Sequence, residues 1–304
     1  MKILLLGADG QVGWELRRAL LPLGDVLPTT RADVDLSNLA LVRDAVCRHG
    51  PDIIVNAAAY TAVDKAEAEP ERANRINAEA VAVLAEETSR LGGWLVHYST
   101  DYVFDGQKAA PYVETDTTGP LNAYGSSKLR GEVAIRDSGC RHLIFRTSWV
   151  YAPRGNNFPR TILRLAQTRD EVRVVSDQIG APTAADLIAD VSALALAQAL
   201  RAPEGAPSGL GGTYHLTAAG QTSWHAFAVH ILRLATAQGY SLKVAPDRVA
   251  PIPTAAYPTA AKRIANSRLA TDKLRATFGL SLPSWETGAA RFMAELPPET
   301  LRTS

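Results

Sequence analysis

The sequence predicts an α/β protein, built on a doubly wound parallel sheet with a smaller, mainly helical lobe formed by later segments. Two observations predict this class. Short apolar stretches alternate with helical stretches through the first half of the 304 residues, which is typical of a parallel sheet covered on both faces. A glycine-rich turn also follows the first apolar stretch directly, and right-handed crossovers then extend the sheet on both sides of it.

The first half provides five strands with helices between them. The predicted strands are Lys2–Gly7, Val26–Thr29, Asp52–Ala58, Trp94–Thr100 and His142–Val150. The predicted helices are Val12–Leu23, Leu39–His49, Ala73–Leu91 and Tyr124 to about Arg136. A loop rich in Gly, Pro, Asp and Thr separates the last of these helices from the fourth strand.

The second half is less regular. Its predicted elements are a helix near Phe158–Thr168, a strand Val172–Ser176, a helix Ala184–Leu200, a surface loop Ala202–Gly212 and an extended segment Tyr214–Thr217. Beyond that segment the pattern is mainly helical. We therefore expect residues 1–150, with segments returning from about 172–217, to form one domain. Residues 151–171 and 218–304 are expected to form a second, discontinuous lobe over the carboxyl edge of the sheet.

Composition indicates an ordinary globular enzyme. Hydrophobic residues make up 46% of the chain and charged residues 21%, which does not fit a disordered protein. Lys and Arg total 32 against 31 acids, so the net charge of +1 argues against coating of nucleic acid or of an anionic membrane.

The sequence also predicts a location. The apolar stretch Ile3–Leu6 is too short for a secretory signal, and no apolar run approaches the ~20 residues that cross a bilayer. Cys47 and Cys140 lie far apart, so we expect two buried, reduced thiols rather than a disulfide. Both observations favour the cytoplasm.

Gly7, Gly10 and Gly13 give the spacing G-x-x-G-x-x-G between an apolar strand and an amphipathic helix. In a Rossmann domain such glycines allow a tight turn, a close approach of backbone to a pyrophosphate and close packing of helix on strand. The N-terminus of the helix adds N–H donors and the positive end of its dipole. This context predicts a dinucleotide site in residues 1–150; an ordinary strand–helix turn is the alternative.

The residues after the second strand bear on cofactor choice. Arg31 follows Thr29-Thr30, and no acid stands there to bind a ribose 2′-hydroxyl, which favours NADPH over NADH. Asp35-Leu36 either clamp the adenine edge or begin a helix N-cap region that runs into Ser37. The next strand ends in small residues, Asn56–Ala59, where either cofactor or tight packing requires them.

Tyr124 and Lys128 stand four residues apart at the start of a predicted helix, so they share one face. A phenol has a free pKa of about 10, and a neighbouring ammonium is expected to lower it toward the working pH. Ser99-Thr100 end the fourth strand at the carboxyl edge, where a hydroxyl can polarise a substrate carbonyl. A solvated Tyr/Lys pair is the alternative for this motif alone.

The order glycine turn, strand-end hydroxyl, tyrosine and lysine resembles the extended branch of the short-chain dehydrogenase/reductase family, which acts on nucleotide sugars. Seven segments narrow the resemblance to the dTDP-4-dehydrorhamnose reductase family: Gly10–Leu16, Asn56–Glu67, Ser99–Phe104, Pro120–Lys128, Arg146–Tyr151, Asp177–Thr183 and Asn266–Leu269. They are spread along the chain from residue 10 to residue 269, so the resemblance extends over nearly its whole length.

The resemblance implies the site residues and the reaction. It implies that the catalytic residues are Thr100, Tyr124 and Lys128, and that the substrate residues are Thr100, Asp101, Tyr102, Trp149 and Arg263. Together with the motifs above, the expected cofactor residues are Gly7, Gly10, Gln11, Val12, Arg31, Asp35, Leu36, Ala58, Ala59, Thr61, Tyr124 and Lys128. The implied reaction is reduction of the C4 ketone of dTDP-6-deoxy-L-lyxo-4-hexulose to dTDP-L-rhamnose by NADPH.

Arg263 and Glu15 are two positions at which the family pattern bears on ligand binding. The family usually has Arg-Pro where this chain has Arg263-Ile264, so the loop that presents Arg263 to the substrate phosphates loses a rigid residue. Some members bind Mg²⁺ at a dimer contact through acids that include the position of Glu15, so a metal there and a homodimer are expectations. One carboxylate does not make a magnesium site, because the ion takes octahedral oxygen ligands.

Two other functions are compatible with the motifs. A nucleotide-sugar epimerase or dehydratase of this branch would keep NAD tightly bound; dehydratases carry Asp-Glu after the Thr, whereas here Tyr102 follows Asp101. A non-catalytic regulatory subunit of the same fold is the third reading, which an intact Thr100, Tyr124 and Lys128 disfavour.

Overall fold

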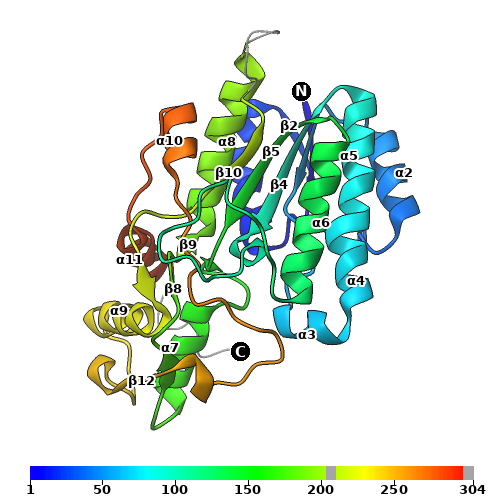
Figure 1. Ribbon diagram of the computed structural model, residues 1–304. Helices are drawn as coiled ribbons and strands as arrows, with labels where there is room; N and C mark the ends of the chain where they lie inside the picture. Colours follow the sequence, from blue (N-terminus) through cyan, green and yellow to red (C-terminus); the bar gives the residue numbers. More distant parts are fainter. Residues whose placement is uncertain (203–209, 297–304) are drawn as a thin grey trace.

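The computed structural model describes residues 1–202 and 210–296, and its centre is a parallel six-stranded sheet. The strand order is β10-β5-β4-β3-β1-β2, and every pairing is parallel (Figure 1). The strands are β1 Lys2–Leu6, β2 Asp25–Thr29, β3 Ile53–Asn56, β4 Trp94–Thr100, β5 Arg141–Thr147 and β10 Gly212–His215. Because β2 and β3 lie on opposite sides of β1, the strand order reverses there, and ligands of open α/β sheets bind outside such a point.

Alternating side chains along the strands bury both faces of the sheet. Ile3 and Leu5 pack on the side of α1 Gln11–Ala19 and α8 Ala185–Arg201. Leu4 and Leu6 pack on the opposite side with α2 Leu39–His49, α5 Ala80–Leu91 and α6 Ala123–Asp137 (Figure 1). Two helical layers around a parallel sheet are the doubly wound architecture that the sequence predicts.

The predicted helix over 73–91 is confirmed, but its pitch is not uniform. α3 Val63–Ala68 and α4 Pro70–Asn74 come first, and α4 continues through a π-helical turn Arg75–Glu79 into α5. The π turn carries Asn77, whose amide accepts from the Tyr60 N–H at 2.8 Å and donates to the Ser127 hydroxyl at 3.0 Å. This side chain ties the loop after β3 to α6, a long-range contact that periodicity in the sequence does not reveal.

A second hydrophobic cluster lies below the carboxyl edge of the sheet in Figure 1. It joins α7 Phe158–Thr168, α9 Trp224–Ala237 and α11 Trp285–Glu295 through buried Leu163, Phe227 and Phe292. Apart from short 3-10 helices, the remaining described elements are four two-residue strands, two three-residue strands and one helix: β6 Val150–Tyr151, β7 Arg173–Val175, β8 Ile179–Gly180, β9 Thr183–Ala184, β11 Thr222–Ser223, β12 Ala250–Ile252 and α10 Asp272–Phe278. The domain boundaries given above stay a prediction.

One of the two predicted buried thiols is confirmed. Cys140 is buried, but Cys47 is exposed on α2, so the prediction of two buried thiols is wrong for Cys47; both are free. Most of the predicted loop at 202–212 lies outside the described residues. No helix in the described part of the chain has the length and apolar character needed to cross a membrane.

A buried ion pair joins α6 to β5. Glu132 and Arg146 are 0% and 3% exposed, and the guanidinium donates to both carboxylate oxygens at 2.9 and 2.7 Å. Burial alone would raise the pKa of Glu132, but the hydrogen bonds and charge of Arg146 outweigh it and lower that pKa. Removing one partner leaves the other charge buried and unpaired.

We expect Glu132→Ala to lower the free energy of unfolding by about 3–5 kcal/mol, because Arg146 then lacks its counter-charge. Glu86→Ala is the matched control, since Glu86 forms an exposed ion pair with Arg43 and such pairs contribute about 0–1 kcal/mol. Urea unfolding followed by circular dichroism measures both. Equal midpoints for the two variants would contradict the structural importance of the buried pair.

Candidate active site

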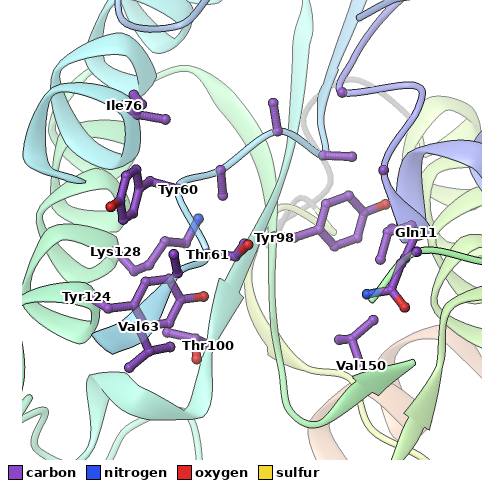
Figure 2. Close-up of a pocket in the computed structure, with 18 of the residues that line it drawn as sticks. Gln11, Tyr60, Thr61, Val63, Ile76, Tyr98, Thr100, Tyr124, Lys128 and Val150 are labelled. Carbon is purple, nitrogen blue, oxygen red and sulfur yellow. The ribbon is translucent and has the colours of Figure 1, made fainter. Parts of the chain in front are cut away.

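A cavity of about 1090 Å³ opens at the carboxyl ends of β1, β3 and β4. Arg154 and Trp224, from the second half of the chain, also line it. Sixteen of the predicted site residues line it: Gly7, Gly10, Gln11, Val12, Arg31, Asp35, Leu36, Ala58, Ala59, Thr61, Thr100, Asp101, Tyr102, Tyr124, Lys128 and Trp149. In Figure 2, Tyr124, Lys128 and Thr100 lie on one side of this pocket and Gln11 and Val150 on the other.

The glycine turn between β1 and α1 admits no side chain at two of its positions. Gly7 has φ +74°, and a Cβ there would lie 2.8 Å from the backbone N of Ala58. A Cβ on Gly13 would lie 1.9 Å from the carbonyl O of Gly7. Gly10 is the N-cap of α1 and has no capping side chain, so the first N–H groups of the helix remain available to an anion. The turn is therefore a cradle for a phosphate group.

Arg31 and Asp35 lie together at the adenosine end that the sequence predicts. Arg31 Nε donates to Asp35 Oδ2 at 3.2 Å, and the Arg31 side chain is 65% exposed. Asp35 also accepts from the N–H and hydroxyl of Ser37 at 2.9 and 2.8 Å; these hydrogen bonds, with the smaller influence of Arg31, lower the pKa of Asp35. Asp35 thus forms a local turn with Ser37 and faces the cavity as well, so the two readings are compatible.

Tyr124, Thr100 and Lys128 converge although they come from α6 and β4 (Figure 2). The Thr100 hydroxyl donates to Asp101 Oδ1 at 3.0 Å and accepts from the Tyr102 N–H at 3.2 Å. Burial raises the pKa of Tyr124 to about 12, partly opposed by a hydrogen bond with Thr100. Burial lowers the pKa of Lys128 to about 8, opposed by Glu132.

The expected lowering of the Tyr124 pKa by Lys128 is therefore wrong for the protein alone. The reason is burial, which raises the pKa of this phenol more than its hydrogen bond with Thr100 lowers it. Nζ of Lys128 lies 3.1 Å from Nε2 of His97, a fully buried histidine of β4. The raised pKa keeps the phenol protonated near neutral pH, which is the form that donates a proton.

The walls near Tyr124 combine a carboxyl group with aromatic rings. Asp101 is 2% exposed, and burial raises its pKa to about 6 against opposing hydrogen bonds from Ser267 and Thr100. The ring of Tyr102 meets that of Tyr124 edge to face, with centroids 5.8 Å apart. A polar group and aromatic faces are what a sugar ring requires of its binding site.

Trp149 adopts a strained backbone conformation. Its φ of 50° is the one positive value among the non-glycine residues that the structure describes. The indole stacks face to face on Trp224, with centroids 3.5 Å apart, and a Cβ on Gly180 would lie 2.7 Å from it. Strain of this kind persists where the surroundings fix it, commonly at ligand sites.

Trp224 lines the cavity, and sequence reasoning missed it. Its position directly after the helix N-cap Ser223 was the one local signal, and it does not distinguish a site residue from a core residue.

Arg263 and Glu15 are not among the residues that line this cavity. Arg263 Nη2 donates to Asp64 Oδ2 at 2.6 Å, and Asp64 also accepts from the Ala261 N–H at 3.0 Å, so the guanidinium holds a loop against α3. Glu15 lies at a separate small cavity with Asp186 and Glu295. Over residues 1–202 and 210–296, no group of three or more His, Cys, Asp or Glu side chains is arranged to hold a metal ion.

We expect Gly13→Ala to abolish dinucleotide binding, because the new Cβ must displace the backbone of Gly7. Gly119→Ala is the control, since its Cβ would meet only the Asp105 side chain at 3.8 Å. Titration of intrinsic fluorescence with NADPH measures the affinity, and circular dichroism checks the fold. Wild-type affinity in folded Gly13→Ala would show that the cradle is elsewhere.

Comparisons with known proteins show which family the chain resembles. The family model described as RmlD substrate binding domain matches residues 1–297. The chain is 53% identical to a dTDP-4-dehydrorhamnose reductase of Burkholderia thailandensis over 285 residues, which are 94% of this chain and 95% of the relative. A dTDP-4-dehydrorhamnose reductase of Escherichia coli is 50% identical, with 97% and 98% covered.

Solved structures give the same family. The crystal structure of a dTDP-4-dehydrorhamnose reductase from Clostridium acetobutylicum has a TM-score of 0.88 at 36% identity, covering 97% of this chain and 99% of that one. The reductase of Bacillus anthracis, solved in complex with NADP, has a TM-score of 0.85 at 36% identity with the same coverage. This chain therefore belongs to the dTDP-4-dehydrorhamnose reductase family.

Proposed function

We propose that this protein reduces the C4 ketone of dTDP-6-deoxy-L-lyxo-4-hexulose to dTDP-L-rhamnose with NADPH. The observation that carries the proposal is that the Tyr124 phenol, the Thr100 hydroxyl and Lys128 open into the same cavity as the glycine cradle. Membership in the dTDP-4-dehydrorhamnose reductase family, with relatives about 50% identical over nearly the whole chain, supports the same reaction.

The cofactor residues divide along the cavity. Gly7, Gly10 and the first N–H groups of α1 would hold the pyrophosphate. Arg31 would turn from Asp35 to a 2′-phosphate, which favours NADPH, while Asp35 would accept the 2′-hydroxyl of NADH as the alternative. Ala58, Ala59 and Thr61 line the cavity between the two ends with small side chains.

Reduction requires a hydride and a proton, and the bound cofactor supplies the hydride to C4. Tyr124 donates its phenolic proton to the oxygen that becomes the alcohol, and its raised pKa keeps that proton in place until the oxygen gains charge. The Thr100 hydroxyl, once it turns from Asp101 Oδ1, would donate a hydrogen bond to the same oxygen. Lys128 holds the nicotinamide ribose and stabilises the phenolate that remains.

Substrate residues surround this centre. Asp101 would accept a sugar hydroxyl, while Tyr102 and Trp149 would cover the ring with their aromatic faces. Arg263 would contact the diphosphate only after leaving Asp64, so we assign it the weakest role. The nucleotide sugar is the one partner that these residues suit.

A dehydratase or epimerase that retains NAD agrees less well with the residues of this site. Tyr102, whose pKa is raised by burial, stands where dehydratases carry a second acid after Asp101. We keep the cytoplasm as the expected location, since the free thiols Cys47 and Cys140 suit a reducing compartment. A homodimer and Mg²⁺ at Glu15 stay predictions.

The direct test of the substrate is NADPH absorbance at saturating cofactor. We expect oxidation of one NADPH per sugar reduced with dTDP-6-deoxy-L-lyxo-4-hexulose, and none with the GDP-linked ketosugar. Oxidation with the GDP compound alone would overturn the substrate assignment. Product formed without net oxidation of NADPH would instead indicate an epimerase or dehydratase.

Tyr124→Phe should lower kcat by about 10²–10⁴-fold, because the general acid is lost while the ring still fills its space. Its affinity for NADPH should stay near the wild-type value. Tyr98→Phe is the matched control: Tyr98 lines the same cavity, but its hydroxyl bonds to Ser192 at 2.9 Å. Equal rates in the two variants would contradict the role of Tyr124 and leave a binding subunit as the better reading.

A further inference from the structure

Behind the cavity, three buried polar side chains form one hydrogen-bonded chain. Asn56 of β3, His97 of β4 and Lys128 of α6 are 1%, 0% and 2% exposed. Asn56 and His97 stand opposite each other in the register of the two strands, with Nδ2 of the amide 3.2 Å from Nδ1 of the ring. The other ring nitrogen, Nε2, lies 3.1 Å from Nζ of Lys128. The packing of α6 on the sheet thus brings Lys128 beside His97.

The protons available on these three side chains limit which of them can donate and which can accept. The backbone N–H of Ala58 donates to Asn56 Oδ1 at 3.2 Å, so the amide oxygen is occupied and its NH₂ group faces the ring. Nδ1 of His97 is then the acceptor, and a neutral ring carries its one proton on Nε2, toward the lysine. An N–H facing Nζ forms a hydrogen bond with a neutral amine, but not with an ammonium, which has no lone pair.

The opposite assignment suits the charged lysine. If His97 carries its proton on Nδ1, Nε2 accepts from the ammonium, and the Asn56 amide turns so that its oxygen accepts from the ring. That turn ends the hydrogen bond from Ala58, a residue that lines the cavity beside Gly7. The ammonium therefore requires the Nδ1–H tautomer, whereas the Nε2–H tautomer, which the hydrogen bond from Ala58 to Asn56 favours, requires the neutral amine.

The charged groups around Lys128 contact other residues, so its Nζ has His97 as its hydrogen-bond partner. Glu132 lies one turn further on α6, but its carboxylate binds Arg146 of β5 and Arg136. Asp101 and Tyr102, from the turn after β4, act on Tyr124. Within the ranges that the structure describes, no carboxylate forms an ion pair with Lys128. Burial, with the charge of Lys128, lowers the pKa of His97 well below its usual value, so the ring stays neutral.

We propose that His97 is a positioning residue for the reaction proposed above: it fixes Lys128 Nζ and matches its own tautomer to the charge of the amine. Lys128 then keeps a hydrogen-bond partner both as an ammonium, which stabilises the Tyr124 phenolate, and as a neutral amine. The ring itself binds neither substrate nor cofactor. The histidine therefore adjusts the pH range in which Lys128 works.

The tautomer is measured directly by ¹⁵N NMR of the full chain with ¹⁵N-labelled histidine. The chain has six histidines, and loss of one signal set in His97→Gln assigns His97. Its proton should lie on Nδ1 at low pH and move to Nε2 as pH rises through about 8, where Lys128 deprotonates. One unchanged tautomer, or an imidazolium, between about pH 6 and pH 10 would overturn the proposal. No sugar is needed, so the result is independent of the substrate assignment.

The pH profile of kcat/KM for NADPH oxidation tests the consequence. The rate should fall above a pH of about 8 in the wild type, because the Lys128 ammonium is lost there. His97→Gln places a carbonyl acceptor toward Nζ and should move the fall upward by about one pH unit, while His97→Leu should move it downward.

The control is His142→Gln, which replaces a half-buried histidine of β5 bonded to the Cys140 carbonyl and should leave the profile unchanged. A purely structural role for His97 would scale the rate at every pH and leave the midpoint fixed in both variants. That outcome contradicts the proposal even where activity is reduced, and NADPH affinity checks that the site is intact.

Discussion

The close backbone contact of the glycine turn with its neighbours is the constraint on which the site depends. Gly13 packs on the carbonyl of Gly7, and Gly7 packs on the backbone of Ala58, at distances that leave no space for a Cβ. These contacts fix the N-terminus of α1 against the end of β3. The dipole of the helix, the small residues after β3 and the strand-end hydroxyl of β4 consequently face one cavity.

Burial then adjusts the chemistry of that cavity. It raises the pKa of the Tyr124 phenol and of the Asp101 carboxyl, and it lowers the pKa of the Lys128 ammonium, because a low-dielectric site disfavours each charged form. The protein alone thus holds a protonated acid and a lysine close to losing its proton. Lys128 is supported by a neutral histidine rather than by a carboxylate, which lets its charge change without leaving a buried ion unpaired.

The sequence predicts most of the sheet and of the cavity because both follow from local patterns. The turn after the first strand identifies Gly7, Gly10 and Gly13 as cofactor residues. A strand end identifies Thr100, and a four-residue spacing on one helix identifies Tyr124 and Lys128. What the sequence does not predict depends on tertiary contacts. The ion pair of Arg263 with Asp64 spans 199 residues, and no local pattern in the sequence indicates it.

His97 and Trp149 show the same limit. A histidine inside an apolar strand looks like a core residue until α6 brings Lys128 beside it. Trp149 combines a positive φ with stacking on Trp224 and close approach to Gly180, contacts that its local sequence does not indicate. Side-chain type identifies candidates, while packing decides what each candidate touches.

In the proposed reaction, hydride reaches the ketone carbon and a proton reaches its oxygen within this cavity. Isotope transfer from NADPH carrying deuterium at both C4 positions of the nicotinamide, with the sugar product analysed by mass spectrometry and NMR, follows the hydride. We expect one deuterium at C4 of the sugar for each cofactor oxidised. A product free of deuterium, formed while the cofactor remains reduced, would contradict the proposed reaction.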